Sequence, residues 1–291
     1  MHPVSNKEHL IEAVTREVMA QLGRGGAAAG DRCSECTGAC AGSCSDKVRR
    51  VVGAGAGRVS FNGNGADVPG DLASYIDHTL LKPESKAADV DRICDEARTH
   101  RFAAVCFNPV WIKRAAARLK GSGVGIASVV GFPLGASTPR IKAAETRQAL
   151  RDGAREIDMV INIGALKSQD YDLVQKDIAG VAEACREVGA ICKVIIETAL
   201  LSDEEKVIAC RLAKAAKAHY VKTSTGFSKG GATVYDVALM REAVGPVMGV
   251  KASGGVKSAG DAQEMIAAGA TRIGASAGVQ MMQGKKSNEQ Y

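Results

Sequence analysis

The chain has 291 residues, 46% of them apolar, a length that suits a domain of about 220 residues carrying an extension. Its formal charge of +6 comes from scattered lysines and arginines, which favours a soluble protein with an anionic substrate. Aromatic residues make up only 4%, which argues against a nucleic-acid partner. No apolar run approaches the ~18 residues of a membrane span, and no secretory signal is recognisable, so we expect a cytoplasmic location without a membrane partner.

A short amphipathic helix is predicted at residues 1–23. Ser5 and Glu8 form a capping box, and Gly23 ends the helical pattern. The apolar positions that fall on one face are Leu10, Ile11, Val14, Val18 and Leu22. Such a helix cannot bury this face alone, so it must dock on its own domain, on another copy or on a partner.

Residues 24–70 are rich in Gly, Ala and Ser and lack periodicity, which predicts a flexible linker. The linker contains four closely spaced cysteines, Cys33, Cys36, Cys40 and Cys44. Four thiolates can bind zinc or an iron–sulfur cluster. Zinc sites usually pair two Cys-x2-Cys units, however, and this segment has one, so free thiols explain the cluster equally well. We predict no obligatory metal.

Short β-branched runs alternate with helical patterns eight times over residues 71–280, ahead of a tail at 281–291. The predicted strands lie near 74–77, 102–107, 124–130, 155–161, 191–196, 219–223, 247–251 and 271–275. Helices are predicted, for example, near 86–99, 139–152, 171–188, 203–217, 232–243 and 258–268. Eight such units predict a closed parallel (β/α)8 TIM barrel. The carboxyl ends of barrel strands meet on one face, where we expect Asp77, Cys106, Asp158, Lys222 and Lys251.

Two lysines close short apolar runs, Lys222 after His219-Tyr-Val and Lys251 after Val247-Met-Gly-Val. Taking an ammonium group out of water is costly, and burial or a second cation nearby favours the neutral, nucleophilic amine. Lysines on neighbouring strands therefore predict an amine that attacks a carbonyl to form a Schiff base. The alternatives are a lysine whose head reaches solvent at the rim and, for Lys251, an ordinary ion pair.

Two acids accompany these lysines. Period-two alternation places Glu156, Asp158 and Val160 on one face of a predicted strand. A carboxylate there either transfers protons or balances the lysines. Asp77 is either a supporting acid or a turn residue.

Seven short motifs, in order, resemble the deoxyribose-phosphate aldolase family from about Tyr75 to Gly278. They lie at residues 76–83, 105–109, 130–135, 156–162, 221–226, 251–255 and 272–276. The resemblance implies that Lys222 forms the Schiff base, Lys251 is the second cation and Asp158 manages proton transfer. It also implies that Asp77 supports the site near a substrate hydroxyl.

The same resemblance implies a phosphate site on the last barrel loops. Its candidate residues are Gly226, Gly254, Gly255, Gly274 and Ser276, whose backbone N–H groups would hold the anion at helix starts. The alternative is that these glycines only make tight turns. Two departures weaken the pattern: Lys257 stands where arginine is common, and Ala277 where a second serine is common. Tyr291 loosely resembles a terminal tyrosine that closes over the site, although a frayed end is the simpler interpretation.

The activity implied by the resemblance is reversible class I cleavage of 2-deoxy-D-ribose 5-phosphate to D-glyceraldehyde 3-phosphate and acetaldehyde. No cofactor is implied, because the protonated imine withdraws electrons as a metal would. A homodimer is expected. Residues 5–22 resemble encapsulation peptides, which would place the enzyme in a bacterial microcompartment with shell proteins as partners. Two other functions stay open: an aldolase with a different acceptor, and a non-catalytic phosphate-binding barrel or scaffold.

Overall fold

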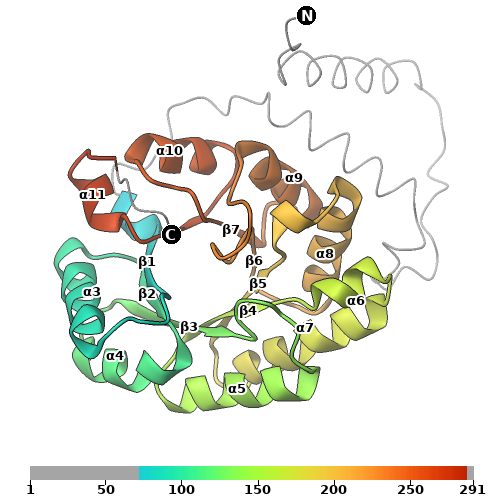
Figure 1. Ribbon diagram of the computed structural model, residues 1–291, viewed down its shortest axis with the longest axis horizontal. Helices are drawn as coiled ribbons and strands as arrows, with labels where there is room; N and C mark the ends of the chain where they lie inside the picture. Colours follow the sequence, from blue (N-terminus) through green and yellow to red (C-terminus); the bar gives the residue numbers. More distant parts are fainter. Residues whose placement is uncertain (1–71, 287–291) are drawn as a thin grey trace, which may run out of the picture.

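The structure is a computed structural model, and it describes residues 72–286. Within this range eight parallel strands close into a barrel in the order β1 to β8, and helices surround it (Figure 1). The predicted TIM barrel is therefore confirmed. The helix at 1–23, the linker at 24–70 and residues 287–291 of the tail lie outside the described residues.

Every strand overlaps its predicted position. The strands are β1 (Ile76–Leu80), β2 (Ala104–Phe107), β3 (Gly125–Val130), β4 (Glu156–Val160), β5 (Ile191–Ile195), β6 (Tyr220–Lys222), β7 (Gly249–Ser253) and β8 (Arg272–Ala275). The largest shift is at β1, because residues Leu72–Tyr75 form a 3-10 helix, η2, where the strand was expected to begin.

The longer helices also match their predictions closely. They are α3 (Ala87–His100), α5 (Pro139–Arg151), α7 (Tyr171–Arg186), α8 (Asp203–Ala215), α9 (Val234–Val244) and α10 (Ala259–Ala267). Three shorter helices, α4 (Ile112–Arg118), α6 (Ile163–Lys167) and α11 (Gly278–Met282), have no counterpart among the helix ranges given as examples from the sequence. These segments have two turns or fewer, too few for a helical period to show in the sequence.

Local sequence sets where the helices begin. Ser202 and Glu205 cap α8 reciprocally, since the Ser202 hydroxyl accepts from the Glu205 N–H and the Glu205 carboxylate accepts from the Ser202 N–H. Ser258 and Asp261 form the same capping box at α10. Thr233 accepts from the Asp236 N–H at the start of α9.

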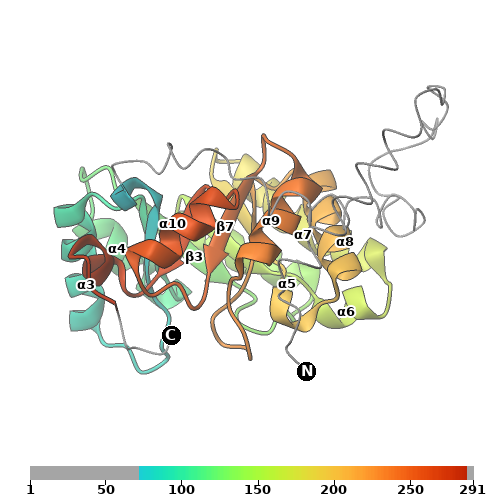
Figure 2. The same cartoon turned by 90° about the horizontal axis from the view of Figure 1, so that it is seen from above.

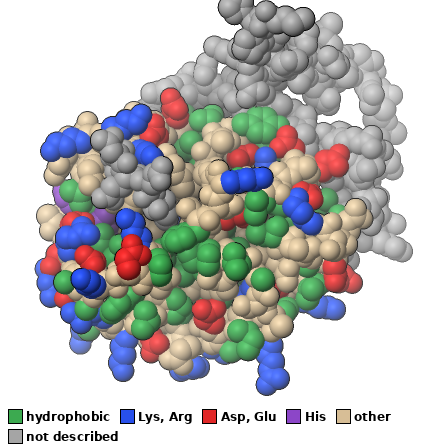
Figure 3. All heavy atoms as spheres, in the orientation of Figure 1, with side chains coloured by type: hydrophobic (Ala, Val, Ile, Leu, Met, Phe, Trp, Pro, Cys, Tyr) green, Lys and Arg blue, Asp and Glu red, His purple; other side chains and the backbone are tan. Residues whose placement is uncertain are grey.

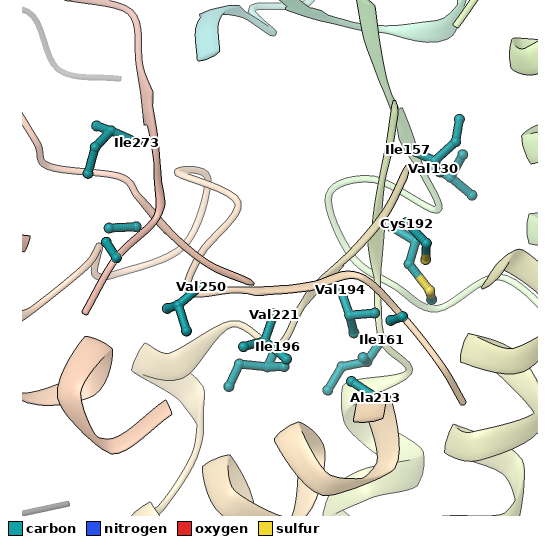
Figure 4. Packing of buried hydrophobic residues seen from close by; sticks show 14 of the residues in the cluster. Val130, Ile157, Ile161, Cys192, Val194, Ile196, Ala213, Val221, Val250 and Ile273 are labelled. Atoms are coloured by element: carbon teal, nitrogen blue, oxygen red, sulfur yellow. The ribbon is translucent and has the colours of Figure 1, made fainter. Parts of the chain in front are cut away.

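Alternation along the strands gives the barrel two different layers. Outward-facing residues pack with the helices into one large apolar core, in which Val194, Ile196 and Val221 lie near Ala213 of α8 (Figure 4). Seen from the side, the helices flank the barrel along its height (Figure 2). The inward-facing positions are free to carry polar groups, because the outer core already supplies the apolar burial.

On the face shown in Figure 3, most charged side chains lie towards the periphery and hydrophobic ones gather nearer the middle. Exposed large apolar side chains among the described residues include Val110, Leu134 and Phe227. None of the helices within 72–286 has both the length and the apolar character needed to cross a membrane.

Candidate active site

Seven charged side chains meet inside the barrel. They come from six strands: Asp77 from β1, Glu156 and Asp158 from β4, Lys193 from β5, Lys222 from β6, Lys251 from β7 and Arg272 from β8. All of them are buried except Arg272, whose side chain is 12% exposed. Burying charges is costly unless they are paired, and here each one contacts at least one group of opposite charge.

Lys222 and Lys251 bind the same carboxylate oxygen. Each Nζ lies 2.8 Å from Asp158 Oδ2. The two lysines are also register partners on neighbouring strands, so their stems run side by side. The structure therefore brings together the three residues on which the predicted chemistry depends.

Asp77 joins the network from the amino-terminal half of β1. Its Oδ1 accepts from Arg272 Nη1 at 2.7 Å, and its Oδ2 accepts from Lys251 and, at 3.2 Å, from Lys193. Asp77 is the second residue of β1, so the expectation that it lies near the carboxyl end of a strand was wrong. Its carboxylate still forms an ion pair with Lys251 of β7.

The sequence analysis missed Lys193. This lysine is fully buried and donates to Asp158 Oδ1 at 2.8 Å, while its Nζ also lies 2.5 Å from Glu156 Oε2. The signal was present, because Lys193 interrupts an apolar strand as Lys222 and Lys251 do. The contact of Lys193 with both Glu156 and Asp158 confirms that period two points both acids into the barrel.

Electrostatics within this network favour the ionised forms. Burial alone would raise the pKa of Asp158, but Lys193, Lys222 and Lys251 outweigh it and hold that pKa well below its usual range. The pKa of Asp77 is also lowered, since Lys193, Lys251 and Arg272 outweigh burial. Burial opposes the charge of Lys193, yet Asp158, Asp77 and Glu156 raise its pKa well above the ordinary value. Lys193 is therefore a fixed cation.

The other side of the barrel interior is apolar. Leu81, Cys106, Ala127 and Val129 form a small cluster of their own, against which Phe132 packs. Burial raises the pKa of the Cys106 thiol to about 11, so this cysteine is a neutral part of the wall. The lysines thus face an apolar surface from across the barrel.

Three of the candidate phosphate-binding glycines lie in the loops after β6 and β7. Gly226, Gly254 and Gly255 all have positive φ, between 77° and 88°. A Cβ on Gly231 would lie 2.3 Å from the Gly254 carbonyl oxygen, so the loops after β6 and β7 approach each other closely. The N–H groups of Lys257 and Ser258 already donate to the Asp261 carboxylate.

Gly274 has a different position from the one expected. It lies inside β8, paired with Asp77 and Ser253, rather than at a helix start. A Cβ there would lie 2.3 Å from Ser253 Oγ and 3.0 Å from Lys251 Cε. The glycine therefore makes room for the Lys251 side chain.

A cavity of about 300 Å³ lies at the carboxyl end of β1, between α3 and α11. Its lining includes Thr79 and Leu81, which belong to or follow β1, Ser276, which follows β8, and Phe227, which follows β6. Phe227 also packs edge-on against Phe132, with ring centroids 5.4 Å apart. The cavity lining does not include the lysines, but these flanking residues place it at the carboxyl end of the barrel.

Glu197 is a second residue that the sequence analysis missed. It lies two residues after the end of β5, has a φ of 58° and is 2% exposed. Its carboxylate accepts from both the N–H and the hydroxyl of Thr225. Burial raises the pKa of Glu197, and Lys222 partly opposes this. No motif marks such a residue, because its conformation depends on the loop packed against it.

Among residues 72–286, no group of three or more His, Cys, Asp or Glu side chains is arranged to hold a metal ion. The four linker cysteines, Cys33, Cys36, Cys40 and Cys44, lie outside the described residues, as does Tyr291.

A parallel eight-stranded barrel with three lysines buried around two carboxylates has the features of a lysine-dependent barrel enzyme. Residues 72–284 match the DeoC/LacD family of aldolases, and the chain belongs to this family.

Relatives of known name agree with this assignment. The chain is 59% identical over 220 residues to the deoxyribose-phosphate aldolase of Streptococcus gordonii, covering 76% of this chain and 99% of the relative. It is 59% identical to that of Macrococcus caseolyticus over 221 residues, covering 76% of this chain and 100% of the relative. Among solved structures, the tetrameric deoxyribose phosphate aldolase of Aeropyrum pernix superimposes with a TM-score of 0.70 at 33% identity, over 81% of this chain and 96% of the other.

Proposed function

We propose that the protein is a class I aldolase that reversibly cleaves 2-deoxy-D-ribose 5-phosphate to D-glyceraldehyde 3-phosphate and acetaldehyde. The observation that carries the proposal is the pair of 2.8 Å contacts that Lys222 and Lys251 make to one oxygen of Asp158. An amine that shares an ionised carboxylate with a second cation has a proton acceptor within reach as it attacks a carbonyl, which is what imine formation requires.

Lys222 is the member of the network best placed to lose its proton. Among residues 72–286, Lys193 forms ion pairs with three carboxylates and Lys251 with two, whereas Lys222 pairs with Asp158 alone. The oxygen that Lys222 uses is also shared with Lys251. Of the three buried ammonium groups, Lys222 therefore has the weakest electrostatic compensation.

Asp158 and Lys251 supply the proton transfers. Asp158 is ionised in the resting site and can accept a proton from the amine as it attacks. The Lys251 ammonium, bound to the same carboxylate, is the donor for the carbinolamine oxygen, which leaves as water. Asp77 holds Lys251 from the other side and supports its charge.

The reaction then follows the chemistry that the family resemblance implies. Lys222 attacks C1 of the open-chain sugar, and loss of water gives a protonated imine. The C3 hydroxyl loses its proton, the C2–C3 bond breaks, and its electrons form an enamine as glyceraldehyde 3-phosphate leaves. Protonation at C2 and addition of water release acetaldehyde and restore Lys222.

The 5-phosphate is proposed to bind where the last loops meet, at Gly226, Gly254, Gly255 and the Ser276 hydroxyl, with Lys257 nearby. The positive φ values of the first three turn the backbone at this point, and Ser276 lines the adjoining cavity. Gly274 contributes by admitting Lys251 rather than by binding phosphate.

The direct test is turnover of 2-deoxyribose 5-phosphate compared with 2-deoxyribose. The proposal predicts that glyceraldehyde 3-phosphate and acetaldehyde form in equal amounts, and that loss of the phosphate lowers kcat/KM by at least about 100-fold. Equal turnover of both sugars would instead favour an aldolase with a different acceptor. No turnover and no imine with acetaldehyde would favour a binding or scaffold role.

The N-terminal extension is proposed to target the enzyme to a microcompartment shell through residues 5–22. The family match begins at residue 72, so the extension is additional to the aldolase domain. A shell would retain the volatile acetaldehyde product. Deleting residues 1–23 should abolish co-assembly with shell proteins and leave turnover intact, whereas unchanged co-assembly would refute the role.

Two further expectations remain proposals. The protein is proposed to form a homo-oligomer, which light scattering coupled to size-exclusion chromatography would test.

Tyr291 is proposed to assist proton transfer, in which case Tyr291→Phe should lower kcat more than KM.

A further inference from the structure

The amino-terminal end of the barrel holds a charged pair that the proposed reaction does not use. Glu156 is the first residue of β4 and Arg272 is the first residue of β8, whereas Lys222 is the last residue of β6. Arg272 Nη1 lies 3.3 Å from Glu156 Oε2. Residues at this end of a barrel ordinarily serve stability alone, because substrates bind at the other end.

Glu156 is linked to Lys222 by three successive contacts, through Lys193 and Asp158. Its Oε2 lies 2.5 Å from Lys193 Nζ, which in turn donates to Asp158 Oδ1 at 2.8 Å. The other oxygen of Asp158 accepts from Lys222. The negative charge of Glu156 therefore reaches Lys222 through buried groups, without intervening bulk solvent.

Arg272 is linked to the same part of the network through Asp77 and Lys251. It donates to Asp77 Oδ1 at 2.7 Å, and Asp77 Oδ2 accepts from Lys251. Asp77 and Glu156 raise the pKa of Arg272 after burial is overcome, so this side chain is a permanent cation.

The position of Arg272 is fixed by an aromatic contact. Its guanidinium carbon lies 5.7 Å from the centre of the Tyr220 ring. A Cβ on Gly249 would come within 2.2 Å of that ring, so the glycine allows Tyr220 to occupy this place. The far end of the barrel is thus built to hold the guanidinium in one position.

We infer that Glu156 and Arg272 are remote positioning residues that set the charge state of Lys222, Glu156 favouring the ammonium form and Arg272 the neutral amine. The inference rests on the proposed role of Lys222. Glu156 is buried and the Arg272 side chain is only 12% exposed, so salt screens both charges little and each acts over the length of the network.

The remaining groups around Lys222 do not replace this pair. β1, β4, β5 and β7 contribute the Asp77, Asp158, Lys193 and Lys251 already described. β3 presents apolar Ala127 and Val129, and β2 presents Cys106, whose raised pKa keeps it neutral. Glu197, after β5, is close enough for Lys222 to influence its pKa, but its carboxylate accepts hydrogen bonds from Thr225 and forms no ion pair with the lysine.

The pair can be tested because its members act in opposite directions. Glu156→Gln removes a negative charge and favours the neutral amine, while Arg272→Met removes a positive charge and favours the ammonium. The measured quantity is the rate at which cyanoborohydride traps acetaldehyde on Lys222, followed by mass spectrometry between about pH 5 and 10. The acid limb of this profile marks the pH at which the amine becomes protonated. The apparent pKa read from this limb is a property of the whole coupled network rather than of one residue.

The inference predicts that Glu156→Gln moves the acid limb down by about one pH unit and Arg272→Met moves it up by about one unit. The double variant should return the limb to within a few tenths of a unit of the wild type. A purely structural role would instead shift or slow both single variants in the same direction, and either that result or coincident limbs would overturn the inference.

Arg272→Lys is the charge-conserving control and should leave the limb in place. If Arg272→Met does not fold, Glu156→Gln and Arg272→Lys carry the test, with a shift required in the first and none in the second. Different results would contradict the proposed function and the role of the Glu156–Arg272 pair. Absence of trapped mass on Lys222 in the wild type would contradict the proposed function, whereas trapping with unmoved limbs would contradict only this inference.

Discussion

The two halves of the barrel interior differ in side-chain chemistry, since one is apolar and the other is charged. Strands β2 and β3 contribute Cys106, Ala127 and Val129, an apolar wall without a charged side chain. Strands β4 to β8 and β1 contribute every member of the charged network. Both halves have the same backbone geometry and the same two-residue alternation, so the contrast lies in side-chain chemistry alone.

The apolar half affects how strongly the charges in the other half interact. An apolar wall keeps water away from the lysines, and charges in such surroundings interact over longer distances than charges in water. The charged half can therefore hold one amine poised to lose its proton, while the wall offers a dry surface for the apolar part of an aldehyde. Four predictions test this division, beginning with the largest expected effect.

Replacing Lys222 by arginine should abolish catalysis while retaining positive charge. We expect turnover to fall on the order of 10^4-fold or more, because a guanidinium cannot form the imine. Steady-state assay with 2-deoxyribose 5-phosphate measures the loss. Lys167→Arg, at a surface lysine 46% exposed, is the matched control and should keep wild-type turnover. Activity of Lys222→Arg within tenfold of the wild type would contradict the division.

Asp158→Asn should lower turnover by about 10^2- to 10^4-fold, because it removes the proton acceptor shared by three lysines. It also gives a pH signature. The pKa of Asp158 is depressed in the folded state, so its stabilising contribution is present above the unfolded pKa and is lost as pH falls. The difference in free energy of unfolding between wild type and variant should therefore shrink below about pH 4. A difference that grows on acidification would mean that Asp158 is not ionised in the native site.

Lys193→Met should act mainly on stability. It leaves Asp158, Asp77 and Glu156 with one cation fewer, and breaking such a buried network typically costs about 3–5 kcal/mol. Urea denaturation gives the free energy of unfolding. Lys167→Met, which breaks an exposed pair with Glu205, should change it by no more than about 1 kcal/mol. Equal effects of the two variants would show that the internal network contributes no more than a surface pair.

The apolar half should respond least. Val129→Thr keeps the shape of the side chain but places a hydroxyl in the wall, which costs about 1–3 kcal/mol without a partner. Turnover should fall by less than about tenfold, because no proton or bond depends on this residue. A loss as large as that of Asp158→Asn would mean that the wall takes part in the chemistry.

The sequence predicted most of the barrel because each strand and each long helix carries a local period. It also predicted Lys222, Lys251 and Asp158, since a charge inside an apolar strand is visible locally. The contacts between strands were less accessible. The roles of Lys193 and Arg272 depend on ion-pair partners up to 195 residues away in the sequence. The position of Asp77 near the amino-terminal end of its strand depends on where β1 begins.

Gly274 and Glu197 illustrate the same limit. A glycine in a strand next to a loop looks like a phosphate-binding turn, and only the packed barrel shows that it accommodates Lys251. The positive φ of Glu197 depends on Thr225 in the following loop, which no spacing rule anticipates. Local chemistry was thus predictable, whereas contacts that depend on register were not.

The central claim is that one particular lysine of three becomes the nucleophile. Incubating the enzyme with acetaldehyde and borohydride, followed by peptide mass mapping, tests it most directly. The account predicts a single ethyl adduct on the peptide containing Lys222 and none on Lys193 or Lys251. An adduct on either of those residues instead, with Lys222 unmodified, would contradict it.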